Sequence, residues 1–265
     1  MDEVSGMVLT AYHKGQLQSC ADDLTTVYPA KIAAFIKKMQ AEKYLTPQHI
    51  TELVREAAIS SEDLMPWADF DHSAYDSYGR KLLFYGGHFE VMVMSWRPGD
   101  FSAIHDHGAT QWGAVQSFGA AKHYIYQLSH CQLHSPVAAH YSPGMVHPVD
   151  HDLIHQMGND SQQPFLSLHV YGCCKTMPSI TGNARVFDLL EGSIQYTDGG
   201  VFFCLPEDKI NKRLYGIKGD MATTLMQHRL MGKRLRHALK EVRSFTMTQK
   251  LKRLKTRLEI MKERL

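Results

Sequence analysis

Between about residue 78 and residue 207 the chain consists of short β-rich segments separated by glycine, proline, asparagine or aspartate. The stretch "KLLFYGGHFEVMVMSW" contains two apolar runs joined at Gly86 and Gly87, which is typical of a hairpin. The segments "AKHYIYQL", "VAAHYSPG", "QPFLSLHVYG" and "VFFCL" follow at similar spacing. Many short strands of this kind predict a mainly β protein built as an antiparallel sandwich or small barrel.

Helical patterns flank the β-rich region on both sides. Near the N-terminus, "AAFIKKMQAEKYL" has apolar residues at helical spacing, and a second helix is expected to begin at Thr46 and Pro47. Beyond about residue 208 the chain turns helical again. We therefore predict three parts, which are an N-terminal helical segment over 1–75, a β domain over 76–207 and a helical C-terminal extension over 208–265.

Charge separates an acidic body from a basic C-terminal end. The formal net charge is +2, yet residues 205–265 contain 17 Lys and Arg against 6 Asp and Glu. In this end Leu251, Leu254 and Leu258 recur in steps of three and four, which predicts an amphipathic helix that packs on its own body or on a second copy of the chain. Self-association through this helix is one prediction. Nucleic-acid binding is not favoured, because a solvated helix face also carries lysine and arginine.

Composition and cysteine content indicate the cellular compartment. No apolar run approaches the roughly 20 residues that span a bilayer, so no membrane segment is expected. The opening stretch "MDEVSGMVLTAYHKG" has no apolar signal core. The five cysteines form no repeated C-x-x-C pattern, which favours reduced thiols in the cytoplasm.

Histidines concentrate in the β-rich region, where ten of the sixteen lie between His88 and His155. In "IHDHGATQWG", His105 and His107 are one residue apart, so on a strand their side chains point to the same face. Two imidazoles on one face form a ready pair of metal ligands. Candidates for a third ligand are His140, His147, His151 and His155.

Two motifs resemble those of the cupin family. Gly99, followed after five residues by His105 and His107, is similar to the first cupin motif, and His155 with Asn159 is similar to the second. The resemblance implies a double-sheet jelly-roll barrel that holds a metal ion through His105, His107 and His155. The alternative is that all three are ordinary core histidines.

Gln111 stands where many cupins carry an acid as a fourth ligand. A neutral amide is a poor ligand for a divalent metal, so the sequence predicts a three-histidine centre that leaves room for a substrate and O2 together. Three histidines would also accept Zn, Ni, Co or Cu, so the ligands by themselves do not select the metal.

Three further stretches, "YGR", "LIHQMGN" and "SLHVY", resemble the cysteine dioxygenase family of thiol dioxygenases, and the resemblance covers roughly residues 65–175. It implies Fe(II) bound by the three histidines, with the substrate thiolate and O2 on the metal and a sulfinic acid as product. It also implies that Arg80 binds a substrate carboxylate, while Tyr78 closes the pocket wall.

The same resemblance implies a role for one face of the strand "SLHVY". The hydroxyl of Tyr171 would bond to oxygen or thiolate at the metal, and Ser167 and His169 would hold Tyr171 in position. The ordinary alternatives are a strand-end arginine at Arg80 and a core tyrosine at Tyr171.

The chain departs from the family pattern at several positions. Some members cross-link a cysteine to the site tyrosine, but Trp112 and Gly113 occupy those positions, so no cross-link is expected. Trp112 either reaches the pocket edge or fills the core, and Cys173 either lines the pocket or is buried as an inert side chain.

These departures leave the substrate open. Cysteine is the first candidate, and 3-mercaptopropionate or a modified cysteine is the alternative. A non-catalytic, metal-binding cupin that acts as a sensor or binding module, with its basic end contacting a partner, is the competing class of function.

Overall fold

The computed structural model describes residues 24–42 and 44–264 of the chain. Predictions about residues 1–23, including the first part of the N-terminal helical segment and the missing signal core, lie outside the described residues. Across the described part of the chain, every helix is too short or too polar to cross a membrane.

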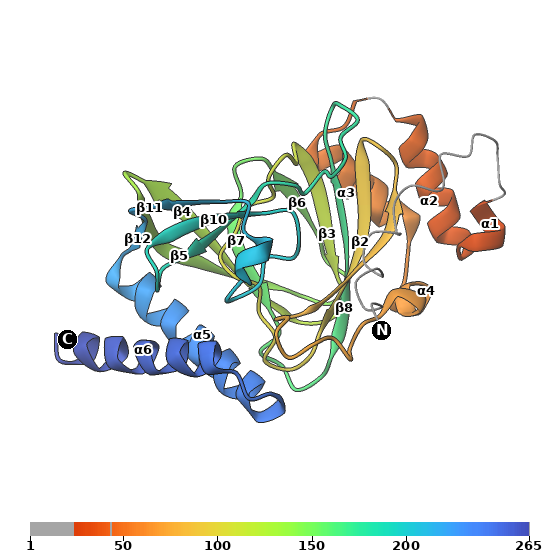
Figure 1. Ribbon diagram of the computed structural model, residues 1–265. Coiled ribbons are helices and arrows are strands. Elements are labelled where there is room, and N and C mark those ends of the chain that lie inside the picture. Colours follow the sequence, from red (N-terminus) through yellow and green to blue (C-terminus); the bar gives the residue numbers. More distant parts are fainter. Residues whose placement is uncertain (1–23, 43, 265) are drawn as a thin grey trace, which may run out of the picture.

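Two antiparallel sheets form the body (Figure 1), and a smaller third sheet lies beside them. The first has the strand order β1 (Gly79–Tyr85), β2 (Phe89–Trp96), β8 (Phe165–Gly172), β3 (Trp112–Ser117) and β6 (Val146–Asp150). The second has the order β12 (Lys218–Gly219), β5 (Gln132–Tyr141), β4 (Ala121–Ser129) and β7 (Ile154–Gly158), with only β12 parallel to its neighbour. The third contains β11 (Lys212–Tyr215), β10 (Ser193–Thr197) and β9 (Ala184–Asp188). The predicted mainly β, double-sheet fold with helices at both ends is confirmed.

The strand β2 is buried on both faces, which explains its nearly continuous apolar sequence. Val91 and Val93 face outward and pack with the N-terminal helices. Met92 and Met94 face inward, where they join the cluster that surrounds the cavity described below. Alternation along one strand therefore supplies both the helix contact and the cavity wall.

N-terminal helices cover the outer face of the five-stranded sheet, at the right of Figure 1. The helix predicted at Thr46 and Pro47 is confirmed, because Thr46 Oγ1 accepts a hydrogen bond from the backbone N–H of His49 at 3.2 Å. The helices of this region are α1 (Leu24–Val27), α2 (Ala30–Ala41), α3 (Pro47–Ala57) and α4 (Ser61–Leu64), followed by a short 3-10 helix, Met65–Trp67.

The basic C-terminal end forms a helical hairpin of α5 (Met221–Glu241) and α6 (Phe245–Lys262), which follow the 3-10 helix Glu207–Lys209. Leu254 is buried in a cluster with residues of α5. The guanidinium of Arg234 donates to the carboxylate of Asp100 at 2.9 Å, so the hairpin is fixed to the body by a buried ion pair. The hairpin packs on its own body, and self-association stays a prediction.

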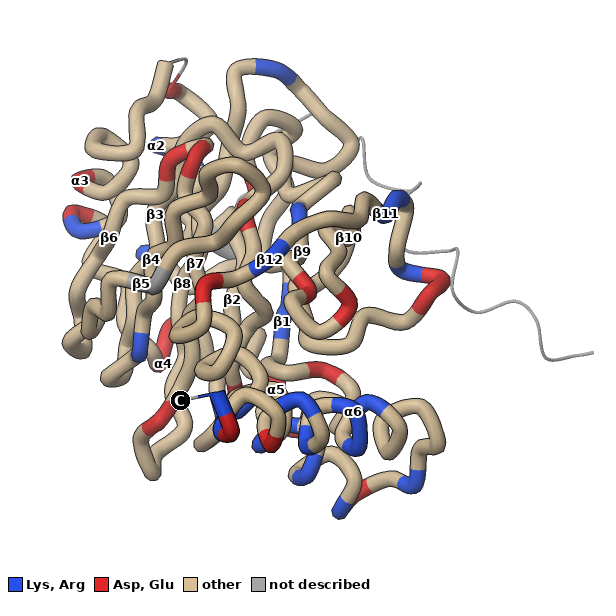
Figure 2. Tube along the Cα trace, turned by 90° about the vertical axis from the view of Figure 1, so that its left-hand side faces the viewer, with Lys and Arg blue, Asp and Glu red and all other residues tan. Residues whose placement is uncertain are grey.

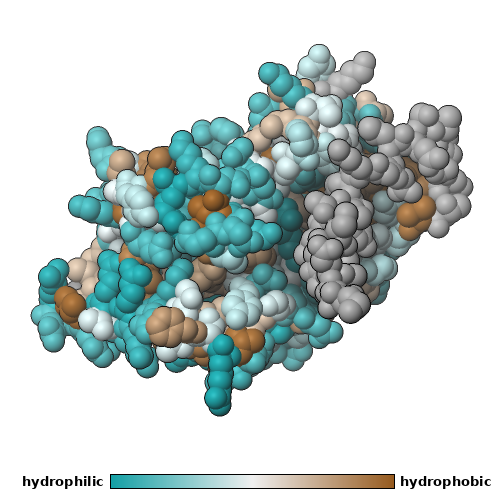
Figure 3. All heavy atoms as spheres, viewed as in Figure 1, coloured by the Kyte–Doolittle hydropathy of each residue, from teal (hydrophilic) through white to brown (hydrophobic). Residues whose placement is uncertain are grey.

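The surface of the molecule differs between its parts. Lysine and arginine recur along α5 and α6 in Figure 2, while the β body carries both signs of charge. The face shown in Figure 3 is mostly hydrophilic, with small hydrophobic patches separated by polar residues. A surface of this kind is ordinary for a folded domain and marks no large apolar interface on this face.

Candidate metal centre and substrate pocket

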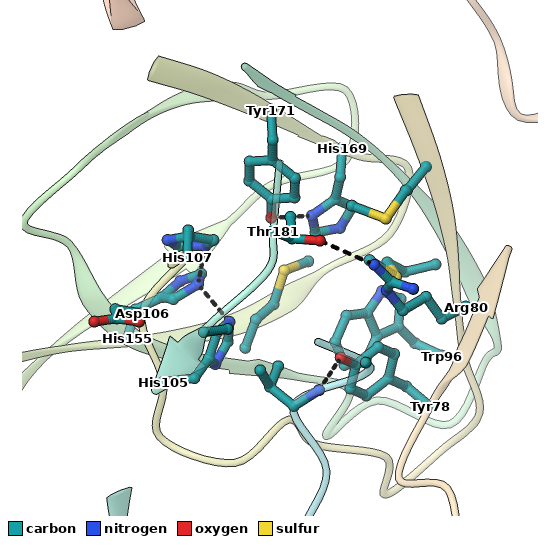
Figure 4. A pocket seen from close by; sticks show the side chains of 16 residues that line it. Tyr78, Arg80, Trp96, His105, Asp106, His107, His155, His169, Tyr171 and Thr181 are labelled. Atoms are coloured by element: carbon teal, nitrogen blue, oxygen red, sulfur yellow. Dashed lines mark hydrogen bonds between the residues drawn. The ribbon is translucent and has the colours of Figure 1, made fainter. Parts of the chain in front are cut away.

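Three histidine side chains converge at one end of a cavity between the two larger sheets (Figure 4). The Nε2 atom of His155 lies 3.1 Å from Nε2 of His105 and 3.0 Å from Nε2 of His107. All three side chains are buried, and their nearest ring nitrogens lie within 4.8 Å of one another. The cluster could therefore hold a metal ion.

The backbone around His105 and His107 differs from the prediction. The two residues were expected on a strand, but they lie in an irregular segment between β2 and β3. Their rings still meet because the backbone of His105 exchanges two hydrogen bonds of 2.9 Å with His155 on β7. Gly108 then turns the chain with φ +59, where an added Cβ would lie 2.1 Å from the carbonyl oxygen of Gly182.

The chemistry of the donor set fits a divalent metal. Nδ1 of His105 lies 2.9 Å from the carbonyl oxygen of Ala103, which can only accept, so Nδ1 carries the proton and Nε2 keeps its lone pair. Burial lowers the pKa of His105 to about 4, and it lowers the pKa values of His107 and His155 well below the ordinary value. All three imidazoles are neutral at pH 7, so a metal would displace no proton from them.

The two acidic or amide side chains nearest the motif face away from the metal position. Asp106 contacts the cavity, but its carboxylate pairs with the guanidinium of Arg185 and accepts the backbone N–H of Gly108. Gln111 Oε1 accepts the backbone N–H of Cys174 at 2.8 Å and does not line the cavity. The ligand atoms that converge in the described part of the chain are therefore three nitrogens.

A series of hydrogen bonds begins at Trp96 on β2, follows one face of the neighbouring strand β8 and ends at Tyr171. The indole N–H of Trp96 donates to Ser167 Oγ at 2.8 Å, and Ser167 Oγ lies 2.7 Å from His169 Nε2. His169 Nδ1 lies 2.8 Å from the hydroxyl of Tyr171. If each group donates to the next, the Ser167 hydroxyl donates to Nε2 of His169, and the N–H at Nδ1 of His169 donates to the hydroxyl oxygen of Tyr171. The Tyr171 proton is then free to donate into the cavity.

Burial keeps the side chains in this series of hydrogen bonds uncharged. Burial, together with smaller contributions from His105 and from the positive charge of Arg80, lowers the pKa of His169 to about 3. Burial raises the pKa of Tyr171 above its ordinary value. The hydroxyl of Tyr171 therefore keeps its proton at neutral pH.

At the other end of the cavity Arg80 is held by a neutral partner. Its guanidinium donates to Thr181 Oγ1 at 3.2 Å, and Thr181 Oγ1 donates to the carboxylate of Glu90 at 3.2 Å. Glu90 also accepts the backbone N–H of Ile180 at 3.0 Å. Within the described residues no carboxylate forms an ion pair with Arg80, so its charge is available to an anionic ligand.

Tyr78 forms part of the wall beside Arg80. Its hydroxyl accepts the backbone N–H of Val201 at 3.1 Å, and its ring stacks on Trp96 with centroids 4.8 Å apart. Burial raises the pKa of Tyr78 to about 12. Tyr78 therefore shapes the cavity as a fixed, neutral ring.

The cavity between the two ends is small, with a volume of about 40 Å³. A water-sized group occupies roughly 10–15 Å³ on this measure, so the space suits a small molecule. Side chains of Met92, Met94 and Met157 supply apolar walls between the histidines and Arg80.

Trp112 and Cys173 lie outside the set of residues that line the cavity. Trp112 is buried on the helix-covered side of the sheet, where its ring fills the space over Gly172. The thiol of Cys173 donates to the carbonyl oxygen of Lys175 at 2.8 Å. Gly113 instead faces the site, since a Cβ there would lie 2.8 Å from Cδ1 of Tyr171, and no thiol is present at that position to form a cross-link.

Sequence reasoning missed Trp96, Thr181, Glu90 and His123. Trp96 could have been found, because alternation from Met92 and Met94 along β2 places it on the same face. Thr181 lies in a segment without periodicity, 101 residues from Arg80 in the chain, so no local pattern marks it.

A family model and several solved structures match parts of the chain. A family model described as cysteine dioxygenase type I matches residues 19–178. Among solved structures, a conserved protein with a double-stranded β-helix domain from Klebsiella pneumoniae is 15% identical, with a TM-score of 0.34, over 43% of this chain and 90% of that chain. A cupin domain from Bordetella pertussis is 12% identical, with a TM-score of 0.31, over 36% and 93%. An oxalate decarboxylase from Lactobacillus farciminis is 13% identical, with a TM-score of 0.32, over 38% and 30%.

Proposed function

The chain belongs to the cysteine dioxygenase type I family, and on that premise we propose that it is an Fe(II)-dependent thiol dioxygenase. Its substrate would be a small thiol carboxylic acid, with cysteine as the first candidate, and its product the sulfinic acid. One observation carries the proposal: the same small cavity has three neutral histidines at one end and, at the other, an arginine that pairs with no carboxylate of the described residues.

The overall reaction adds both atoms of O2 to one sulfur. The thiolate RS⁻ and O2 give the sulfinate RSO2⁻, so sulfur loses four electrons and O2 gains four, with no other reductant. His105, His107 and His155 would hold the Fe(II), which when bound makes the spin-forbidden reaction accessible and keeps thiolate and O2 in contact.

Arg80 would bind and orient the carboxylate of the substrate. A guanidinium can form two parallel hydrogen bonds to a carboxylate, which fixes the direction of the rest of the molecule. The bond to Thr181 holds the guanidinium in place without neutralising its charge. With the carboxylate at Arg80, a short carbon chain directs the sulfur across the cavity toward the histidines.

Tyr171 would hold a proton at the reacting end. The hydrogen bonds from Trp96 through Ser167 and His169 leave the Tyr171 hydroxyl as a donor toward the cavity. Its ring centroid lies 5.0 Å from that of His107, so the hydroxyl belongs to the metal end of the pocket. A donor there stabilises negative charge that develops on oxygen or sulfur.

A specific observation favours 3-mercaptopropionate as the second candidate substrate. Among the described residues that line the cavity, Asp106 is the one carboxylate, and it is paired with Arg185. The cavity therefore provides no free acid for the ammonium group of cysteine. Either the cysteine amine binds the metal, or the substrate lacks an amine.

O2 uptake by the anaerobically Fe(II)-loaded protein, with sulfinate measured by mass spectrometry, tests the proposal. We expect thiol-dependent uptake, and the ratio of kcat/KM for cysteine to that for 3-mercaptopropionate identifies the preferred substrate. Bound iron with no O2 uptake on either thiol or on N-substituted cysteines would contradict the dioxygenase and favour the non-catalytic metal-binding protein.

A further inference from the structure

His123 contacts one of the three proposed ligands from behind. It lies on β4, which pairs with β7, and its side chain is only 2% exposed. Its Nε2 atom lies 2.7 Å from Nδ1 of His155, and the two rings meet edge to face with centroids 4.9 Å apart. Among the described residues this is the shortest hydrogen-bond contact made by any of the three ligand side chains, and it lies on the side of His155 that faces away from the cavity.

The geometry determines which atom of this pair must carry the proton once a metal is bound. His155 points Nε2 toward His105 and His107, so Nε2 must keep its lone pair for a metal. A neutral imidazole has one N–H, and in His155 it is then on Nδ1. Among the described residues that N–H can donate only to His123 Nε2, so His123 must be the tautomer with its own proton on Nδ1, an atom that has no hydrogen-bond partner in the same part of the chain.

The three ligands differ in how their second nitrogen is held. His105 donates to the backbone carbonyl of Ala103, and His107 Nδ1 has no partner among the described residues. His155 alone depends on a side chain. A group that accepts a hydrogen bond from the second nitrogen of a metal-binding histidine fixes the orientation of the ring and raises its basicity. Loss of such a group typically lowers metal affinity by about 10- to 100-fold.

We propose that His123 is a positioning residue for the metal centre, acting as the hydrogen-bond acceptor that fixes the orientation and tautomer of His155. The inference rests on the proposed metal site. It does not depend on which thiol is the substrate.

Tyr141 provides a matched control in the same place. Its hydroxyl lies 3.4 Å from His123 Nε2, and its ring lies flat against His147 with centroids 3.6 Å apart. The lone pair of His123 Nε2 is directed to His155 at the shorter distance, so Tyr141 contributes mainly packing. Tyr141→Phe keeps that packing and removes only the hydroxyl.

The test measures Co(II) affinity by competition with a chelator, using the visible absorption of the bound ion, for the whole chain and three variants. His123→Leu removes the acceptor and is expected to weaken Co(II) binding by about 10- to 100-fold. His123→Gln presents an amide oxygen at similar reach, and it and Tyr141→Phe are expected to stay within about threefold of the unchanged protein. Equal affinity for His123→Leu, or equal losses for His123→Leu and His123→Gln, would overturn the proposal.

A measurement on the unaltered chain covers the case in which His123→Leu does not fold. In ¹⁵N-labelled protein loaded with Zn(II), we expect His123 Nε2 to be unprotonated and coupled through the hydrogen bond to Nδ1 of His155. A proton on His123 Nε2 with Zn(II) bound would overturn the proposed role of His123 and leave the metal site intact. Failure of Zn(II) and Co(II) to bind the three histidines would instead overturn the metal site of the proposed function.

Discussion

The two ends of the cavity are built on opposite electrostatic principles. At the metal end, burial keeps His105, His107 and His155 uncharged, so nitrogen lone pairs are presented in a dry site. At the far end, Arg80 keeps a full charge and is held by the hydroxyl of Thr181. In the proposed function, the histidine end would hold the metal that binds the thiolate of the substrate, and Arg80 would bind its carboxylate. Changes at the two ends should therefore have separable effects.

The largest effect is expected from removing a ligand. His107→Ala deletes one of the three ligand nitrogens. Fe(II) affinity should therefore fall by more than the roughly 100-fold that loss of a ligand's hydrogen-bond partner can cause, and activity should disappear with the metal. Metal content after gel filtration and O2 uptake measure both. His140→Ala, an exposed histidine of β5, is the control and should retain both. Full metal content in His107→Ala would show that the metal binds elsewhere.

The next largest effect belongs to the far end. Arg80→Met removes charged hydrogen bonds worth about 1.5–3 kcal/mol, so kcat/KM for cysteine should fall by about 10- to 150-fold. Iron content should not change, which separates this variant from His107→Ala. As a control, any turnover of 2-aminoethanethiol, a thiol without a carboxylate, should be the same with and without Arg80. Equal losses on both thiols would contradict a carboxylate role.

The metal end should also make the metal-free protein sensitive to acid. Burial lowers the pKa of His105 to about 4 and that of His169 to about 3, whereas the unfolded chain binds these protons near pH 6.5. Below pH 6.5 the unfolded state binds more protons than the folded state. The contribution of these histidines to the free energy of unfolding is therefore largest above that pH and falls as the pH drops toward 4. Each such histidine contributes up to about 1.4 kcal/mol per pH unit.

Urea unfolding of the metal-free chain at pH 7, 6 and 5 measures this slope. His169→Gln should reduce the slope by about 1.4 kcal/mol per pH unit, since one titrating group is lost. Arg80→Met should leave the slope nearly unchanged, because it removes no side chain of a type that titrates in this range. A free energy of unfolding that is flat between pH 7 and 5 would argue against neutral histidines in the folded state.

The smallest expected effect concerns the support of Arg80. Thr181→Val keeps the side-chain volume but removes the hydroxyl that accepts from Arg80 and donates to Glu90. Because Arg80 itself remains, substrate binding should lose only about 0.5–1.5 kcal/mol, so KM for the thiol should rise by about 2- to 10-fold with kcat little changed. Steady-state kinetics at saturating O2 measure it. A fall in kcat with unchanged KM would place Thr181 in the chemistry rather than in substrate orientation.

The metal end was easier to predict than the far end for a physical reason. His105 and His107 are neighbours in sequence, and alternation along β8 places Ser167, His169 and Tyr171 on one face, so local spacing carries most of the information. The partners of Arg80 come from a segment about a hundred residues later in the chain. Only the folded sheet brings Thr181 and Glu90 beside it, and no local pattern records that contact.

Trp112 shows where local spacing is ambiguous. The sequence left Trp112 either at the pocket edge or in the core, because β3 is buried on both faces and its sequence does not reveal which face looks inward. The structure puts Gly113 against Tyr171 and turns Trp112 toward the helices. A shift of one residue exchanges the two faces of a strand, so the sequence could not decide between the pocket edge and the core for Trp112.

The most direct test of the central claim is the fate of labelled oxygen in the Fe(II)-loaded protein supplied with L-cysteine, or with 3-mercaptopropionate if that thiol is preferred, under ¹⁸O2. If the two ends hold the thiol and O2 together as proposed, each sulfinate molecule should contain two labelled oxygens and O2 consumed should equal sulfinate formed. Sulfinate with one labelled oxygen, or O2 uptake that yields only disulfide, would contradict the dioxygenase.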